Sequence, residues 1–501
     1  MIQTMVDRFR ARQLERYFVV TLLLVAAGAA VISLIIGLQQ SVWFDEAYSV
    51  FLAKQPVLDL VHYASVDVHP PLYYVLLKGW AGLFGWSDAA LRSLSVLAMG
   101  GAVVLGGLLT KRMFGVRAAL MTLPFIALSP LLLRYGFEIR MYALASLIGI
   151  AATYVLVVAL ETGNRSRQWK LYALYAVLVA LGLYTHYFMV LLWLAHLVWL
   201  GWRAYRERRP IVRTPWFVAL VGGAVLFLPW MPILMMQAGD GAHVTVLQAM
   251  TIENLVGIVS FLFLYQPAWH LSAYGTIMII FIVIALGVLI AKTFKKASKK
   301  ERDYLCLFAL YLLVPIALIA LVSLWHPLYV ERLIAPFGLG AMLLVGVVVS
   351  YSAKKSSPWT VLSVIVLYVV LLFGVGQLAR AGNTNYQRLE KPAVQAAAEG
   401  IGACGHGTTV LAADPYVAME LSYYMPSCEM RFYSTSDNLT GGFAPLASSP
   451  LRIAHPESEL TNSVKLQYVY YGKPRLTMPT NLVQVAHDSY DGLSVDTYMA
   501  Q

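Results

Sequence analysis

Two adjacent acids follow directly on the first long apolar run of the chain. Asp45 and Glu46 stand in the segment SVWFDEAYS, among the aromatic residues Trp43, Phe44 and Tyr48. A carboxylate in such surroundings can accept the proton of a hydroxyl group, which is the task of a general base. Acids kept beside a membrane-like segment are costly and therefore indicate function. The alternative is that the pair only ends the apolar run in water.

A second polar group, Asp67 and His69, follows about twenty residues later in the sequence DVHPP. An imidazole titrates near neutral pH, so a carboxylate beside it can bind a substrate or exchange a proton with it. The alternative is a turn in which Asp67 caps the helix that starts at the proline pair. Lys78 lies in that next segment and can stabilise negative charge on a leaving group.

Three later segments add polar side chains. They supply Glu138, Arg140 and Tyr142 from RYGFEIRMYAL, His186 from LYTHYFMV, and Arg332 from LWHPLYVERLIAPF. Arg332 suits an anionic head group at a bilayer surface, and snorkelling of its side chain is the alternative. Arg134 and Glu138 are four residues apart and can simply pair on a helix. For His186 the plain alternative is an ordinary interfacial histidine.

The composition requires that membrane helices position these groups. Hydrophobic residues make up 59% of the 501 residues, charged residues 13%, and the mean hydropathy is +0.68. A soluble globular chain has about 25% charged residues, so a soluble enzyme is excluded. A spanning helix needs roughly 20 mostly apolar residues. Eleven such runs occur, at about 18–38, 93–110, 118–133, 141–160, 171–186, 188–202, 215–236, 271–291, 304–325, 333–352 and 359–379.

Basic residues fall in every second loop between these runs, and these loops hold most of the 37 Lys and Arg residues. The positive-inside rule then puts the N-terminus in the cytoplasm of a multi-pass cell-membrane protein. It puts all five polar segments on the extracytoplasmic face. The net charge of +11 is explained by this topology, so we expect no nucleic-acid partner.

The first external loop, about 39–92, contains two amphipathic segments between and after its polar residues. QPVLDLVHYA and PPLYYVLLKGWAGLFGW are predicted to be helices lying in the membrane interface. Such helices would hold an active-site loop at the membrane surface.

The pattern of residues predicts two domains. Residues 1–380 form a transmembrane catalytic domain, and residues 381–501 form a small extracytoplasmic α/β domain. Helices are expected at 386–401 and 414–426, and strands at 408–413, MRFYS, LQYVYYG and LVQVAHDSYDGLSVDTYM. Cys404 and Cys428 lie in this tail, where they form either a disulfide or two free buried thiols. The tail shows no nucleotide-binding motif.

The motifs WFDEAYS, DVHPPLYYVLLKGWAGLFG, ALRSLS, FEIRMYAL, THYF and YVERL, in this order, resemble a known family. They are similar to bacterial relatives of the protein O-mannosyltransferases, which are GT-C-fold glycosyltransferases of the family 39 type. These also resemble the lipid A aminoarabinose transferase. The resemblance covers about residues 15–355 and implies an all-α polytopic GT-C-like domain.

The resemblance also implies a reaction and its residues. The donor would be a sugar on a polyprenyl monophosphate, used outside the cytoplasm without a nucleotide and with inversion at the anomeric carbon. Asp45, with Glu46 beside it, maps onto the acid that acts as base. A second acid maps onto Glu138, although FEIRMY stands where relatives commonly have Gln-Glu-Ala-Arg-Met-Tyr. Arg332 matches the basic position that contacts lipid phosphate.

The same residues make chemical sense without the resemblance. A sugar hydroxyl is a poor nucleophile, so a carboxylate must take its proton as the new bond forms. The leaving phosphate can be stabilised by fixed cations, for which the chain offers Arg332, Arg140 and Lys78. No cofactor is then required. A divalent cation is the alternative, held by Asp67 and His69 with His186 and Glu138.

Two other functions compete with this prediction. A glycan ligase that uses a lipid-pyrophosphate donor would also be external, but it should carry a late loop rich in His and Arg. The loop at 237–270 has only His243 and His270. A flippase or transporter should show internal repeats and polar breaks within its spans, and none is evident.

The sequence does not identify the sugar, which stays open among mannose, glucose, galactose, arabinose and aminoarabinose. The acceptor stays open among protein Ser/Thr, a lipid glycan and a cell-wall polymer.

Overall fold

The computed structural model of the chain describes residues 2–239, 249–266, 271–352, 358–381, 393–405, 407–436, 439–447 and 449–501. Its elements divide into two compact units. The transmembrane unit comprises Met1–Gly37, Asp88–Pro232 and Val244–Arg380. The loop–tail unit comprises Leu38–Ser87, Ile233–His243 and Ala381–Gln501. The tail, treated above as a separate domain, therefore shares its unit with the first external loop.

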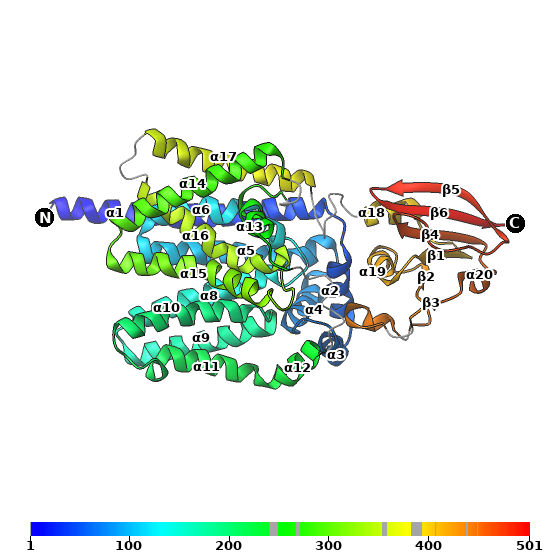
Figure 1. The fold of residues 1–501 in the computed structure, drawn as a ribbon, viewed down its shortest axis with the longest axis horizontal. Helices are drawn as coiled ribbons and strands as arrows, with labels where there is room; N and C mark the ends of the chain where they lie inside the picture. The colour runs from blue at the N-terminus through cyan, green and yellow to red at the C-terminus, as the bar shows by residue number, and fades with distance from the viewer. Residues whose placement is uncertain are drawn as a thin grey trace. The chain divides into compact units, whose positions relative to one another are not determined.

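Long helices make up the transmembrane unit (Figure 1). They are α1 Ile2–Leu38, α5 Asp88–Phe114, α6 Val116–Leu128, α7 Pro130–Gly136, α8 Tyr142–Glu161, α9 Arg165–Thr185, α10 Met189–Arg206, α11 Pro215–Phe227, α13 Ile252–Phe263, α14 Ala273–Lys296, α15 Lys299–Val322, α16 Ala335–Ser352 and α17 Pro358–Ala381, with short 3₁₀ turns η1 Ile211–Arg213, η2 Leu228–Trp230 and η5 Glu331–Ile334. Helix α12 Met231–Gly239 follows η2 and falls mainly in the loop–tail unit. Helix α16 packs against α6, α8, α14 and α15. It is apolar all round and almost wholly buried, as expected of a central helix.

The predicted polytopic helical fold is confirmed. Among the described residues, eight helices are long and apolar enough to cross a membrane, and the bent pair α6–α7 makes a ninth candidate. The remaining two predicted spans, 171–186 and 188–202, lie in α9 and α10. Basic residues at the start of α9 and the end of α10 shorten their apolar stretches.

The span predicted at 118–133 is not one straight helix. Helices α6 and α7 meet at Ser129 with a bend of 60°. A residue that precedes proline is disfavoured in the helical conformation, and Ser129, before Pro130, has φ −59° and ψ 120°. The Ser129 hydroxyl donates to the carbonyl of Leu262 at 3.0 Å, so the broken backbone is tied to α13.

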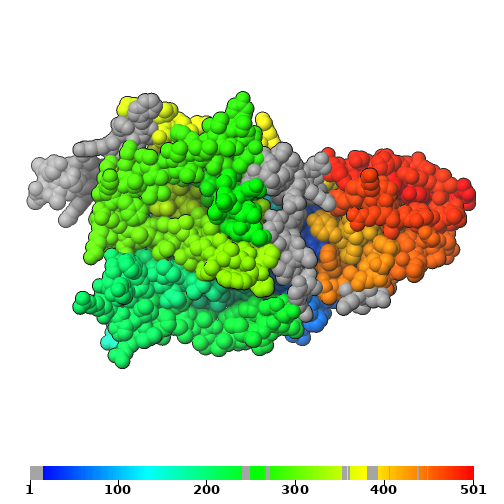
Figure 2. Space-filling model, in the orientation of Figure 1, coloured from blue at the N-terminus to red at the C-terminus, as the bar shows by residue number. Residues whose placement is uncertain are grey.

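Large apolar side chains are exposed along α11, α14 and α15, whose surfaces are drawn in green in Figure 2. Examples are Val218, Val225, Ile277, Ile284, Leu313 and Leu321. Water would disfavour such a surface, whereas hydrocarbon tails match it. These faces are therefore suited to contact lipid.

The first loop forms three helices, α2 Phe44–Lys54, α3 Val57–Val66 and α4 Leu72–Phe84. Helices α3 and α4 correspond to the two predicted interfacial segments. Helix α2 was not predicted, because Asp45 and Glu46 directly follow the first apolar run and the two helices predicted in this loop begin later. Tyr48 joins the three helices: its hydroxyl donates to the Tyr63 carbonyl at 3.5 Å, and its ring meets that of Tyr74 edge-on.

The tail forms a six-stranded sheet of order β3-β2-β1-β4-β6-β5. The strands are β1 Thr408–Ala412, β2 Glu429–Tyr433, β3 Arg452–Ile453, β4 Lys465–Tyr471, β5 Leu482–Tyr490 and β6 Leu493–Ala500, and the helices are α18 Val394–Ile401, α19 Pro415–Tyr424 and α20 Pro456–Glu459, with the 3₁₀ turn η6 Gly441–Leu446. Strands β3, β2, β1 and β4 are parallel, and β6 is antiparallel to both β4 and β5. Asp491 and Gly492 both have positive φ, which a tight β5–β6 hairpin turn requires.

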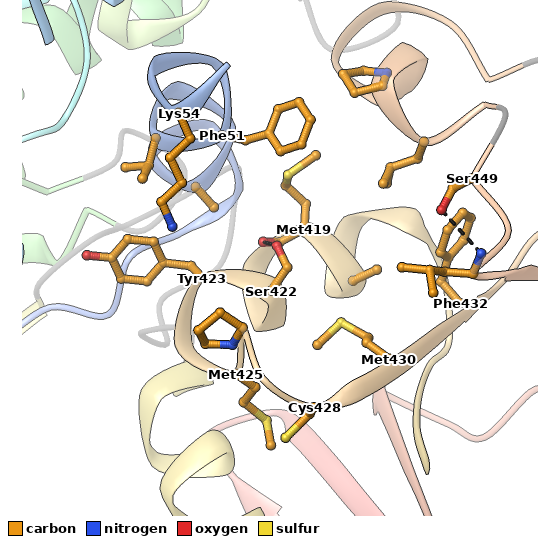
Figure 3. A pocket seen from close by; sticks show the side chains of 17 residues that line it. Phe51, Lys54, Met419, Ser422, Tyr423, Met425, Cys428, Met430, Phe432 and Ser449 are labelled. Carbon is orange, nitrogen blue, oxygen red and sulfur yellow. Dashed lines mark hydrogen bonds between the residues drawn. The ribbon is translucent and has the colours of Figure 1, made fainter. Parts of the chain in front are cut away.

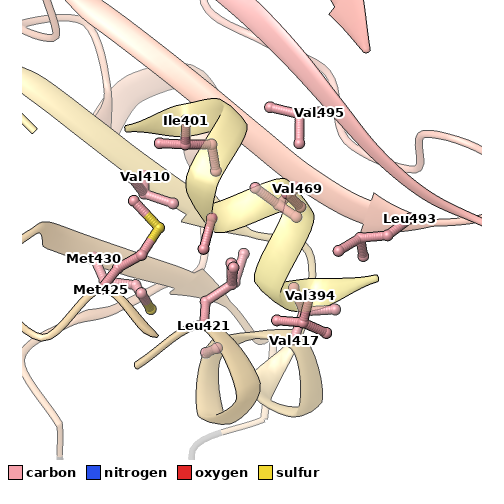
Figure 4. Packing of buried hydrophobic residues seen from close by; sticks show 14 of the residues in the cluster. Val394, Ile401, Val410, Val417, Leu421, Met425, Met430, Val469, Leu493 and Val495 are labelled. Carbon is pink, nitrogen blue, oxygen red and sulfur yellow. The ribbon is translucent and has the colours of Figure 1, made fainter. Parts of the chain in front are cut away.

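The predicted tail elements are present, except that residues 386–392 of the first predicted helix lie outside the described residues. Asp414 caps α19 as predicted, because its carboxylate accepts from the Val417 amide at 2.9 Å. The short strand β3 and helix α20 were not predicted. Helices α18 and α19 cover one face of the sheet with a core shown in Figure 4, formed by Val394, Ile401, Val410, Val417, Leu421, Met425, Met430, Val469, Leu493 and Val495. Cys404 and Cys428 form a disulfide beside this core.

Candidate active site

Asp45 and Glu46 lie together in the first turn of α2, where a helix favours negative charge. Glu46 is fully buried, and its Oε2 accepts from the Trp43 amide at 3.4 Å. Asp45 is half-buried. Glu46 thus helps to start the helix, while Asp45 is the more accessible carboxylate. This difference favours Asp45 as the acid that meets a substrate.

Asp67 and His69 are brought together as predicted, with Asp67 Oδ2 3.1 Å from His69 Nδ1. Asp67 ends α3, and the next helix starts after Pro71 without a side-chain cap. Asp67 is therefore not the cap of α4, which was the alternative role. A carboxylate that contacts one ring nitrogen fixes the orientation of the imidazole.

Lys78 connects two helices of the first loop. Its Nζ donates to the carbonyls of Ala53 at 3.2 Å and Gln55 at 2.7 Å. These carbonyls belong to the C-terminal end of α2, where a cation is favourable. An ammonium group has three donors, so Lys78 keeps one beyond these two hydrogen bonds.

The transmembrane unit buries four charged side chains, Arg92, Arg134, Glu138 and Arg140. Arg134 donates to Glu138 Oε1 at 3.2 Å, which is the pairing given above as the alternative to a site role for Glu138. The guanidinium groups of Arg92 and Arg134 lie 5.6 and 5.2 Å from the Phe137 ring centre. The Ser95 hydroxyl, one turn along α5 from Arg92, donates to the Arg140 carbonyl. Arginines gathered in this way are suited to a phosphate group. Arg92 was not predicted as a site residue.

Tyr142 and His186 come together in the same unit, with ring centres 5.9 Å apart. The Phe188 amide donates to His186 Nδ1 at 3.2 Å, so the neutral ring carries its proton on Nε2. Tyr142 also meets Tyr135 edge-on at 5.1 Å. Both residues were predicted to lie on the extracytoplasmic face of the protein. In the structure their rings pack against each other.

Arg332 lies in η5, which packs against α15 and α16. Its side chain is half-buried. Tyr329, three residues before it, is buried, and burial raises the pKa of its hydroxyl. Tyr329 therefore stays protonated and able to donate a hydrogen bond.

A metal centre has limited support from the geometry. Within the described part of the chain, no three His, Cys, Asp or Glu side chains form a group that could hold a metal ion. Asp67 and His69 offer two ligands in the loop–tail unit, whereas Glu138 and His186 belong to the transmembrane unit.

The loop–tail unit contains a cavity of about 370 Å³ beside α2. Its walls are the α2 residues Ala47, Val50, Phe51 and Lys54, and tail residues that include Met419, Ser422, Tyr423, Met425, Met430 and Phe432. In Figure 3, Lys54 and Tyr423 lie on one side and Phe432 on the other. The lining is mainly apolar with a cation at one side, which suits an apolar group that carries an anionic end. This cavity could not be predicted from local sequence patterns, because the segments that line it are far apart along the chain.

The comparisons with known proteins agree with this fold. Residues 68–235 match the model of the family described as dolichyl-phosphate-mannose-protein mannosyltransferase. The structure is similar to ArnT from Cupriavidus metallidurans, solved with undecaprenyl phosphate, with a TM-score of 0.61 and 12% identity over 95% of this chain and 97% of that one. It is also similar to the oligosaccharyltransferase of Archaeoglobus fulgidus, solved with zinc and sulfate, with a TM-score of 0.50 and 11% identity over 89% and 67% of the two chains.

No curated protein matches the sequence. The structural matches show that this chain has the fold of the GT-C membrane glycosyltransferases. Together with the family match, they confirm the resemblance expected from the motifs.

Proposed function

We propose that this multi-pass membrane protein is a glycosyltransferase that uses a polyprenyl-monophosphate sugar. The sugar passes to an acceptor hydroxyl on the extracytoplasmic face with inversion. The observation that carries this proposal is the half-buried Asp45 in the first turn of α2, beside the fully buried Glu46. The similarity to ArnT, which was solved with undecaprenyl phosphate, supports the donor class.

Asp45 acts as the general base in this reaction. It takes the proton of the acceptor hydroxyl while the oxygen attacks the anomeric carbon. The bond from that carbon to the phosphate oxygen breaks, and polyprenyl phosphate leaves with the electron pair. One displacement at the anomeric carbon gives inversion.

Cations stabilise the negative charge of the departing phosphate. We assign this role to Arg140 and Arg332, with the remaining donor of Lys78. Glu138 holds Arg134 and so helps to form the buried arginine group. Asp67 and His69 bind the acceptor or donor sugar, and Tyr142 and His186 line the substrate site. No cofactor is required; loss of transfer on chelation would instead assign Asp67 and His69 to a divalent cation.

The orientation follows from the distribution of basic residues, which puts the N-terminus in the cytoplasm. The tail then lies outside, where a disulfide such as Cys404–Cys428 is stable.

The cavity beside α2 is suited to an apolar part of the acceptor. On that assignment, Lys54→Gln should raise the KM for the acceptor and leave the KM for the donor unchanged.

The test is transfer from a panel of radiolabelled polyprenyl-phosphate sugars in membranes. Asp45→Asn should lower the rate about 100-fold or more, because a general base contributes about 10²–10⁴-fold. Asp59→Asn is the matched control: Asp59 also lies in the first turn of a helix of the same loop, and it is exposed. Its rate should stay within about twofold.

A fully active Asp45→Asn variant would remove Asp45 from the mechanism. A wild-type protein that consumes only pyrophosphate-linked donors would favour the ligase. Movement of a lipid-linked sugar across liposomes without transfer would favour the flippase.

A further inference from the structure

We propose that Glu420, in the tail helix α19, is a positioning residue for Asp45. This inference rests on the proposed role of Asp45 and goes beyond it. It assigns the tail a part in catalysis, namely to fix the start of the helix that carries the base.

Two hydrogen bonds join the tail to the residues just before and at the start of α2, and a third, within the tail, holds Glu420 in place. The Phe44 amide donates to Glu420 Oε1 at 3.0 Å, and the Tyr471 hydroxyl donates to Glu420 Oε2 at 3.0 Å. The Val42 amide donates to the Tyr424 hydroxyl at 2.5 Å. Both oxygens of Glu420 are thus used, and its side chain is fully buried.

The Phe44 amide needs a partner from elsewhere, because the first amides of a helix have no carbonyl within that helix. Trp43, at the capping position, makes no side-chain cap. Glu420 accepts this hydrogen bond from a segment 376 residues away. A carboxylate at a helix N-terminus is also favoured by the helix dipole. Glu420 therefore acts as the cap of α2.

Contacts of the Phe44 ring also hold the start of α2 against the tail. The Phe44 ring stacks on Tyr416 of α19, with ring centres 4.7 Å apart and 9° between the planes. It also meets Phe443 of η6 at 5.0 Å. The residue next to Asp45 is therefore held through both its backbone and its ring.

Lys78 holds the opposite end of α2 through the carbonyls of Ala53 and Gln55. Both ends of the helix are thus fixed by charged side chains from other elements. A base must lie within hydrogen-bonding distance of the proton it removes. A displacement of about 1 Å can cost about 100-fold in rate. Loss of the Glu420 cap should therefore lower turnover without removing any group that contacts substrate.

The experiment compares Glu420→Ala and Glu420→Gln in the full-length protein in nanodiscs. Glu420→Ala should lower kcat about 100-fold while the donor KM stays within about threefold. Glu420→Gln keeps an oxygen for the Phe44 amide and should restore kcat to within about fivefold of wild type. Glu399→Ala, an exposed carboxylate on α18, is the control and should leave kcat unchanged.

Hydrogen exchange supplies a readout that needs no substrate. Glu420→Ala should speed exchange in residues 42–48 and leave the β1 and β4 amides protected. If it also unfolds the tail, Tyr471→Phe becomes the decisive variant, because it removes one hydroxyl and keeps the ring. It should then lower kcat about tenfold with the tail intact.

The outcomes separate the two proposals. Faster exchange at 42–48 with unchanged kcat, or unchanged exchange in Glu420→Ala, would overturn the positioning role. A fully active Asp45→Asn variant would instead overturn the proposed function, whatever the exchange shows.

Discussion

Asp45 and Glu46 are neighbours in sequence but differ in their surroundings. Glu46 is fully buried and accepts a hydrogen bond from the Trp43 amide, whereas Asp45 is half-buried. Sequence alone could not separate their roles, because burial here depends on packing of α2 against the tail helix α19. Asp67 and His69 were easier to predict as a pair, since two residues of separation keep their side chains close.

Lys78 allows a prediction that separates a structural role from a binding role. Lys78→Met removes two hydrogen bonds to the end of α2 and should lower the stability of the protein by about 1–3 kcal/mol. Thermal unfolding in nanodiscs measures this, with Lys473→Met, an exposed tail lysine, as the control. Unchanged stability with a tenfold weaker affinity for polyprenyl phosphate would mean that Lys78 serves the ligand alone.

At the scale of elements, local patterns predicted most of the tail. Alternating residues indicated β4, β5 and β6, and the Asp-Pro pair at 414–415 indicated the start of α19. Helix α2 was missed because its acids directly follow a long apolar run and no separate helical pattern stands out there. The break between α6 and α7 had a local signal, Ser129-Pro130, but a long apolar stretch hid it.

The disulfide gives a prediction for the tail. Cys404 and Cys428 are 24 residues apart, and closing such a loop in the unfolded chain stabilises the folded state by about 3 kcal/mol. The double variant Cys404→Ser, Cys428→Ser should lower tail stability by about that amount, measured by protease resistance on heating. Cys306→Ser, at an exposed free cysteine, is the control. Equal resistance of the two variants would contradict a stabilising disulfide.

At the scale of the whole molecule, composition and charge predicted a multi-pass membrane protein. What they could not predict was the make-up of the loop–tail unit from three separate segments. Glu420 shows why. It stands in an otherwise apolar helix, and nothing near it in sequence indicates that its partner is the Phe44 amide.

Orientation can be tested by labelling in intact cells. In a Cys306→Ser background, Ser458→Cys in the tail should react with a membrane-impermeant maleimide from outside. Lys299→Cys, at the start of α15, should react only after lysis. Both positions are exposed, so access differs only by the side of the membrane. The reverse pattern would place the N-terminus outside.

The cap of α2 also sets the order of folding during synthesis. Phe44 emerges early, and Glu420 is made 376 residues later. At roughly 5–20 residues per second, the first loop waits about 20–75 s for the segment that completes it. During that interval the Phe44 amide lacks the carboxylate that caps α2. A chain truncated before α19 would therefore keep α2 without its N-terminal cap.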